Sequence, residues 1–123
     1  MSNQVVVARI PGLAGRIAEL RALLSDRAAV ARREPGCLGY EVAELLDEPA
    51  TFLVVETWAS ADAMRAHFGT AEHATYQQQI GELLARPSEV VLHDVATTTR
   101  PSASFGPAPP PPALPWHRAQ LSS

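Results

Sequence analysis

Hydrophobic residues recur with two different periods along the chain, and their alternation predicts a domain of mixed helices and strands. Val5 to Ile10 is apolar at nearly every position, which is typical of a strand buried along most of its length, and Pro11-Gly12 ends it. Apolar residues then recur at intervals of three and four, the spacing of one helical face: Leu13, Ile17, Leu20, Leu24, Ala28 and Ala31. We expect this helix to end before Pro35-Gly36.

The middle of the chain predicts a β-hairpin. Leu38 to Leu45 and Thr51 to Trp58 have the composition of strands. Asp47-Glu48-Pro49-Ala50 joins them with residues that favour tight turns.

A second helix and a last strand are expected after the hairpin. Ser60 can accept a hydrogen bond from the first free amides of a helix, so it is the expected N-cap. Gly69 should interrupt this helix, and Thr70 can cap its continuation towards Leu84. Val90 to Val95 then forms the last strand.

The resulting order, βαββαβ, is that of the ferredoxin-like unit, an α+β fold with a four-stranded antiparallel sheet. Two helices can cover only one face of such a sheet. The other face carries enough valine and leucine to leave a large apolar patch in water. Packing two such faces across a twofold axis would bury them, so we expect a homodimer that forms a dimeric α/β barrel.

The composition divides the chain into a domain at residues 1–100 and a proline-rich tail at residues 101–123. Proline has no amide donor and a fixed φ, so the run Pro109 to Pro112 favours extended polyproline II or disorder. Leu114 and Trp116 are an apolar pair that could dock onto a surface. The tail is expected to be dispensable for folding.

Charge and cysteine content exclude several classes of function. A net charge of -3 argues against nucleic acid and anionic membranes as partners. We expect neither a signal peptide nor a membrane span, because no apolar run has the length that either needs. Cys37 is the single cysteine, which fits a reducing compartment, and the expected location is the cytoplasm.

Side chains that can bind or react are expected between the helices and the sheet. Tyr76 should share a helical face with His73, and Trp58 ends its strand on the side of Phe52 and Val54. His67 and His73 are six residues apart, with no carboxylate or cysteine at ligand spacing, so no metal site is expected. A glycine-rich phosphate loop is also absent from the sequence, so no nucleotide cofactor is expected.

Three segments together resemble the antibiotic biosynthesis monooxygenase family: Glu34 to Val42, Phe52 to Trp58 and Ala66 to His73. The similarity extends from about Val5 to Thr98. It implies a small dimeric α/β barrel that oxidises aromatic substrates without a metal or flavin.

The haem-degrading branch of this superfamily has asparagine, tryptophan and histidine at three positions that hold Ala8, His67 and Gln77 here. Haem oxygenation is therefore not expected.

The resemblance and the residues together favour a cofactor-independent monooxygenase that acts with dioxygen on a phenolic, anthrone-like or quinol-type substrate. His67 or His73 would be the base, because a histidine can take up a proton near neutral pH. Trp58 and Tyr76 would donate hydrogen bonds to the substrate oxyanion. The expected substrate-binding residues are Tyr40, Arg9 and Phe68.

Two other functions fit the same residues. One is an isomerase or cyclase that uses the same acid–base pair without dioxygen. The other is a non-catalytic small-molecule-binding module.

Overall fold

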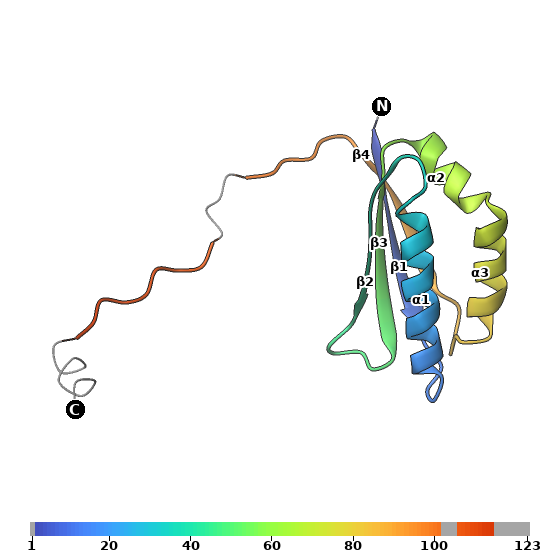
Figure 1. Cartoon of the computed structure of the whole chain (residues 1–123), viewed down its shortest axis with the longest axis horizontal. Coiled ribbons are helices and arrows are strands. Elements are labelled where there is room, and N and C mark those ends of the chain that lie inside the picture. Colours follow the sequence, from blue (N-terminus) through green and yellow to red (C-terminus); the bar gives the residue numbers. More distant parts are fainter. Residues whose placement is uncertain (1, 102–105, 115–123) are drawn as a thin grey trace.

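The computed structural model describes residues 2–101 and 106–114. These residues form a four-stranded antiparallel sheet with its helices on one face, in the strand order β2-β3-β1-β4 (Figure 1). The elements are, in chain order, β1 (Asn3–Pro11), α1 (Ile17–Ala31), β2 (Cys37–Glu44), β3 (Thr51–Trp58), α2 (Ala61–Phe68), α3 (Ala71–Gly81) and β4 (Glu89–Val95). This is the ferredoxin-like α+β fold that the sequence predicts, with the second helix divided into α2 and α3.

The break between α2 and α3 has the expected cause. Ser60 Oγ accepts a hydrogen bond from the amide of Ala63 at 3.1 Å and caps α2. Gly69 ends α2, and Thr70 Oγ1 then accepts from the amide of His73 at 3.1 Å and caps α3. Because each helix has its own capping side chain, both begin where the sequence predicts.

Two boundaries of the first and last helices were predicted wrongly. Leu13 was placed on the apolar stripe of α1, but it lies before that helix and is 38% exposed. The positive φ of Gly15, 88°, makes a turn there, and the amide of Leu13 bonds to the carbonyl of Leu83 instead of joining a helix. At the other end α3 stops at Gly81, short of the expected Leu84.

The inner face of the sheet, defined as the face that the helices cover, carries the hydrophobic core. Strand pairing aligns Ala8 with Val54 and Ile10 with Phe52, and all four side chains are buried. The helix α1 packs its apolar stripe against this layer. The buried stripe residues are Leu20, Leu24, Ala28 and Ala31.

The outer face of the sheet, which no described helix covers, is also apolar. Val5 and Val7 of β1 lie on it beside Val55 of β3, and all three are partly exposed. Val91 of β4, which pairs with Val7, is 51% exposed. The homodimer expected from this face remains a prediction.

The chain after β4 forms neither helix nor strand at residues 106–114. Leu114 is 47% exposed. Trp116, its expected apolar neighbour, lies outside the described residues, so docking of this pair remains a prediction. None of the described helices is long and apolar enough to cross a membrane.

Candidate functional site

A cavity of about 440 Å³ lies between the inner face of the sheet and α3. Its apolar walls come from β1, β3, β4 and α3, with Phe68 at the end of α2; these wall residues are Val6, Ala8, Ile10, Val54, Phe68, Ile80, Val90 and Leu92. Val90 and Leu92 pair with Ala8 and Val6, so β4 extends the same wall, and both are about half exposed. The cavity is large enough for a small aromatic ligand.

Six side chains with polar groups line the same cavity: Tyr40, Glu56, His73, Tyr76, Gln77 and Ser88. Tyr40 and Glu56 are register partners on β2 and β3, so their side chains emerge side by side on the inner face. His73 and Tyr76 come from successive turns of α3, and their rings lie 5.7 Å apart. The sheet therefore contributes two of these polar groups and α3 contributes three, while Ser88 comes from the connection before β4.

Glu56 is a carboxylate in a nearly dry environment. Its side chain is only 6% exposed, and its Oε1 accepts a hydrogen bond of 3.0 Å from Nε1 of Trp58. Burial raises the pKa of Glu56 to about 6, while the bond from Trp58 and the charge of Arg27 act in the opposite direction. Such a carboxylate can accept a proton near neutral pH.

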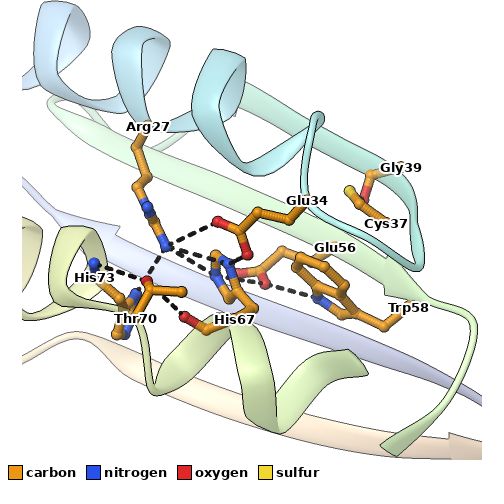
Figure 2. A network of polar contacts seen from close by, with 9 residues as sticks. All are labelled: Arg27, Glu34, Cys37, Gly39, Glu56, Trp58, His67, Thr70 and His73. Carbon is orange, nitrogen blue, oxygen red and sulfur yellow. Dashed lines mark hydrogen bonds and ion pairs between the residues drawn. The ribbon is translucent and has the colours of Figure 1, made fainter. Parts of the chain in front are cut away.

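His67 lies beside this carboxylate (Figure 2). It is buried, with Nε2 3.5 Å from Oε1 of Glu56 and Nδ1 2.9 Å from Oε2 of Glu34. Its ring also stacks against Trp58, with centroids 4.5 Å apart. Glu56 lines the cavity and His67 does not, so a ligand in the cavity meets the carboxylate and not this histidine.

Arg27 connects both histidines to Glu34. Its Nη2 lies 3.1 Å from Nδ1 of His67, 3.2 Å from Nδ1 of His73 and 3.7 Å from Oε1 of Glu34. The side chain is 3% exposed, and its Nε has no hydrogen-bond partner in the described part of the chain. Figure 2 shows Arg27 reaching from α1 into the space between the two rings.

Burial and this guanidinium keep both histidines neutral. Burial is the larger cause and lowers the pKa of His67 to about 4, with the charge of Arg27 acting in the same direction. The pKa of His73 is also lowered to about 4, by burial first and then by His67 and Arg27. Arg27 can only donate, so Nδ1 of a neutral His73 accepts and its proton lies on Nε2.

The two tyrosines remain protonated and able to donate. Burial, followed by the charge of Glu56, raises the pKa of both Tyr40 and Tyr76. Neither hydroxyl makes a hydrogen bond to another described residue, although both residues line the cavity. They are therefore available to a ligand.

The structure brings together most of the residues that the sequence singled out. Tyr40, His73, Tyr76 and Phe68 line the cavity, whereas Trp58 and His67 lie beside Glu56.

Arg9 is not part of this cluster. It lies on the outer face of the sheet and pairs with Glu48 at 2.6 Å, because its position on β1 alternates with the buried positions.

Three charged residues of the site were missed by the sequence analysis: Arg27, Glu34 and Glu56. Glu56 could have been found, because it lies on the same strand parity as Val54 and Trp58 and a carboxylate is unexpected there. Arg27 lies next to Ala28 on the buried stripe of α1. Glu34 gives no periodic signal, because it lies in the connection between α1 and β2.

Among the described residues, no group of three or more histidine, cysteine, aspartate or glutamate side chains is arranged to hold a metal ion. The polar end of the cavity offers a carboxylate, an imidazole and two phenols. Such a set can accept a proton, donate hydrogen bonds and bind a planar apolar molecule.

Comparison with known proteins identifies a family match. Residues 3–79 match the family model described as antibiotic biosynthesis monooxygenase.

Two sequence relatives cover different shares of their own lengths. Rv0793 of Mycobacterium tuberculosis, which is named as a candidate monooxygenase, is 33% identical over 74% of this chain and 89% of its own length. The Synechocystis protein sll1783, named as uncharacterised, is 34% identical over 54% of this chain. In that case the match spans only 46% of the relative.

Solved structures show the same fold. The structure of Rv0793 superimposes with a TM-score of 0.70 at 31% identity, covering 84% of this chain and all (100%) of that one. A Deinococcus radiodurans protein, titled as a candidate antibiotic biosynthesis monooxygenase, gives a TM-score of 0.77 at 25% identity. That match covers 81% of this chain and 99% of the other.

Proposed function

We propose that this chain, which belongs to the antibiotic biosynthesis monooxygenase family, uses dioxygen to oxidise a phenolic, anthrone-like or quinol-type aromatic substrate without a metal or flavin. One observation carries the proposal: an apolar cavity of about 440 Å³ ends on the buried carboxylate of Glu56, beside two free phenol hydroxyls. These groups support the proposed substrate class, since an acidic aromatic molecule fits both the apolar walls and the base.

The proposed reaction needs no external reductant. An anthrone CH₂ group and dioxygen together give a carbonyl and one water, so the substrate supplies all the electrons. The step that the protein must promote is removal of the first proton, because the resulting enolate can pass an electron to dioxygen. The task of the site is thus to accept a proton and stabilise an oxyanion.

Glu56 is the proposed base, in place of the histidine expected from the sequence. It lines the cavity, whereas His67 does not, and burial raises its pKa to about 6. His73 lines the cavity, but its Nδ1 accepts from Arg27 and its Nε2 carries the proton. His73 is therefore a hydrogen-bond donor in its neutral form.

Tyr40 and Tyr76 are the proposed donors to the substrate oxyanion. Trp58 was expected in this role, but its indole N–H is already bonded to Glu56 at 3.0 Å. The two phenols have no other described partner, and the apolar walls strengthen any hydrogen bond that they make to an oxyanion.

We also propose that the chain acts as a homodimer through the outer face of its sheet. That face carries Val5, Val7, Val55 and the 51% exposed Val91. Covering it would remove apolar surface from water, which favours association.

Dioxygen consumption tests the proposed reaction. Metal-stripped, flavin-free protein is mixed with a panel of anthrones and hydroquinones in an oxygen electrode. Uptake that depends on protein concentration supports the monooxygenase. Conversion of the substrate without uptake would identify an isomerase or cyclase instead, and saturable binding without conversion would identify a binding module.

A further inference from the structure

Glu34 and His67 have no role in substrate contact, yet they form a continuous polar line with Glu56. The line begins at Glu56 in the cavity, passes through the buried ring of His67 and reaches Glu34, whose side chain is 17% exposed. Each neighbouring pair is separated by 3.5 Å or less: 3.5 Å from Glu56 to Nε2 of His67, and 2.9 Å from Nδ1 to Glu34. The line thus uses both nitrogens of one imidazole.

The far end of this line faces a second hollow in the surface. This hollow, of about 420 Å³, is lined by Glu34 and His67 together with residues of the α1–β2 connection, the β3–α2 connection and α2. It shares no lining residue with the cavity beside Glu56. Glu34, whose side chain is partly exposed, therefore has access to water that does not pass through the substrate site.

We propose that Glu56, His67 and Glu34 form a proton relay that connects the substrate cavity to the solvent at this second hollow. The inference rests on the proposed function, because it assigns the route of the proton that Glu56 takes from the substrate. His67 and Glu34 act through Glu56 and touch no ligand themselves.

The relay requires one direction for each proton transfer. Nδ1 of His67 has two polar neighbours, Oε2 of Glu34 at 2.9 Å and Nη2 of Arg27 at 3.1 Å. The relay assigns the hydrogen bond to the shorter contact, in which an ionised Glu34 accepts, and so it places the proton of neutral His67 on Nδ1. Nε2 is then an acceptor that faces Oε1 of Glu56. Once Glu56 has received a proton it can donate it to Nε2, while Nδ1–H passes its own proton to Glu34.

The proton count balances over one turnover. The substrate O–H or C–H proton moves to Glu56, and Glu34 releases one proton to water. The same line returns a proton when dioxygen is reduced and water forms. Removing the first proton from the cavity prevents it from returning to the enolate before dioxygen reacts.

Arg27 accounts for why a neutral imidazole can occupy this position. Its guanidinium lies 3.1 Å from Nδ1 of His67 and opposes a second proton on the ring. A relay residue must release each proton that it receives. A permanently charged imidazolium between two carboxylates would keep its proton and could not act as a relay. Burial of the ring also lowers the pKa of His67 and so favours the neutral form.

The protonation state of His67 tests the relay without any assay of turnover. Proton–nitrogen correlation NMR of the histidine rings in the full chain reports which nitrogen carries hydrogen, and the variant His67→Gln assigns the signals. The relay predicts a neutral ring with hydrogen on Nδ1 at pH 7. A ring with hydrogen on Nε2, or a doubly protonated ring, would overturn it.

The variant Glu34→Gln tests transport itself. The amide retains a hydrogen-bond acceptor but cannot take up the proton, so kcat should fall roughly tenfold or more while KM stays unchanged. Added imidazole, which can enter the second hollow and accept the proton, should restore part of the rate. A structural role would not respond to imidazole.

The matched control is Glu41→Gln, which removes a carboxylate that is 78% exposed, and its kcat should match that of the wild type. Unchanged turnover in Glu34→Gln, or a loss that imidazole does not restore, would contradict the relay alone. Absence of dioxygen uptake by the wild type is a different result. It would reject the proposed monooxygenase, and the NMR measurement would then decide the relay.

Discussion

Trp58 and Glu56 lie two residues apart on β3, and the indole Nε1–H of the first donates to Oε1 of the second at 3.0 Å. Both side chains are on the inner face, because residues separated by two share one side of a strand. The tryptophan therefore acts on the proposed base and not on the substrate. This bond lowers the pKa of Glu56, against the rise that burial causes.

Trp58→Phe should shift the acid side of the pH–rate profile upwards. Glu56 must be ionised to accept a proton, so in the wild type the rate falls as pH drops through about 6. Removing the N–H donor raises the pKa of Glu56 further, and the fall should then begin at a higher pH. Steady-state kcat/KM measured across pH checks this; an unchanged or lower midpoint would refute the role given to Trp58.

Acidification should destabilise the folded protein. His67 and His73 have folded pKa values near 4, below their ordinary 6.5, so the unfolded chain binds protons more readily between these values. Stability is present above about pH 6.5 and is lost as pH falls towards 4. Glu56 has a raised pKa and acts oppositely, but its shift is smaller, and the net loss is on the order of 3 kcal/mol.

Urea unfolding at several pH values measures this loss. The variant His73→Gln should show a weaker dependence on pH. His93→Gln, which replaces an exposed histidine on β4, should behave like the wild type. Equal stability of the wild type at pH 7 and at pH 4.5 would contradict the burial of two neutral histidines.

Gly36→Ala should unfold more easily and misplace Glu34. Gly36 has a φ of 81°, and an added Cβ would lie 2.5 Å from the Cβ of Ala63 on α2. Strain and overlap together should cost roughly 1–3 kcal/mol in the free energy of unfolding. Gly81→Ala is the control, since an added Cβ there meets no atom within 4 Å. Equal losses in the two variants would show that close approach of the loop to α2 does not matter.

Val55→Asp should convert the expected homodimer to a monomer, because it places a charge in the middle of the outer face. Sedimentation equilibrium of both proteins measures the change. Val30→Asp is the matched control, since Val30 is 40% exposed on α1 and should leave the dimer intact. A stable wild-type monomer at micromolar concentration would remove the prediction.

The fold could be predicted from local signals. The apolar run in β1, the strand composition of β3, the turn at Asp47 to Ala50, and the caps Ser60 and Thr70 each act over a few residues. The start of α1 could not be placed, because apolar spacing continues back to Leu13 while the turn at Gly15 depends on backbone conformation.

The candidate site could be predicted only in part. Histidine and tyrosine were recognised from their chemistry, and the parity of Trp58 and the helical face of His73 were predicted correctly. The charges were missed, because Arg27, Glu34 and Glu56 meet only when α1, the α1–β2 connection and β3 pack together. The residue type of Trp58 suggested a hydrogen-bond donor to the substrate, but its bond to Glu56 makes it a donor to the proposed base.

Isotopically labelled dioxygen supplied to wild-type protein and to Glu56→Gln tests the central claim most directly. With an anthrone as substrate and metal-stripped, flavin-free protein, we expect one labelled oxygen in the new carbonyl group and the other in water. Replacing the carboxylate by an amide of the same shape should lower kcat roughly 10²- to 10⁴-fold with the fold intact. A product without labelled oxygen, or an undiminished rate in Glu56→Gln, would contradict the account.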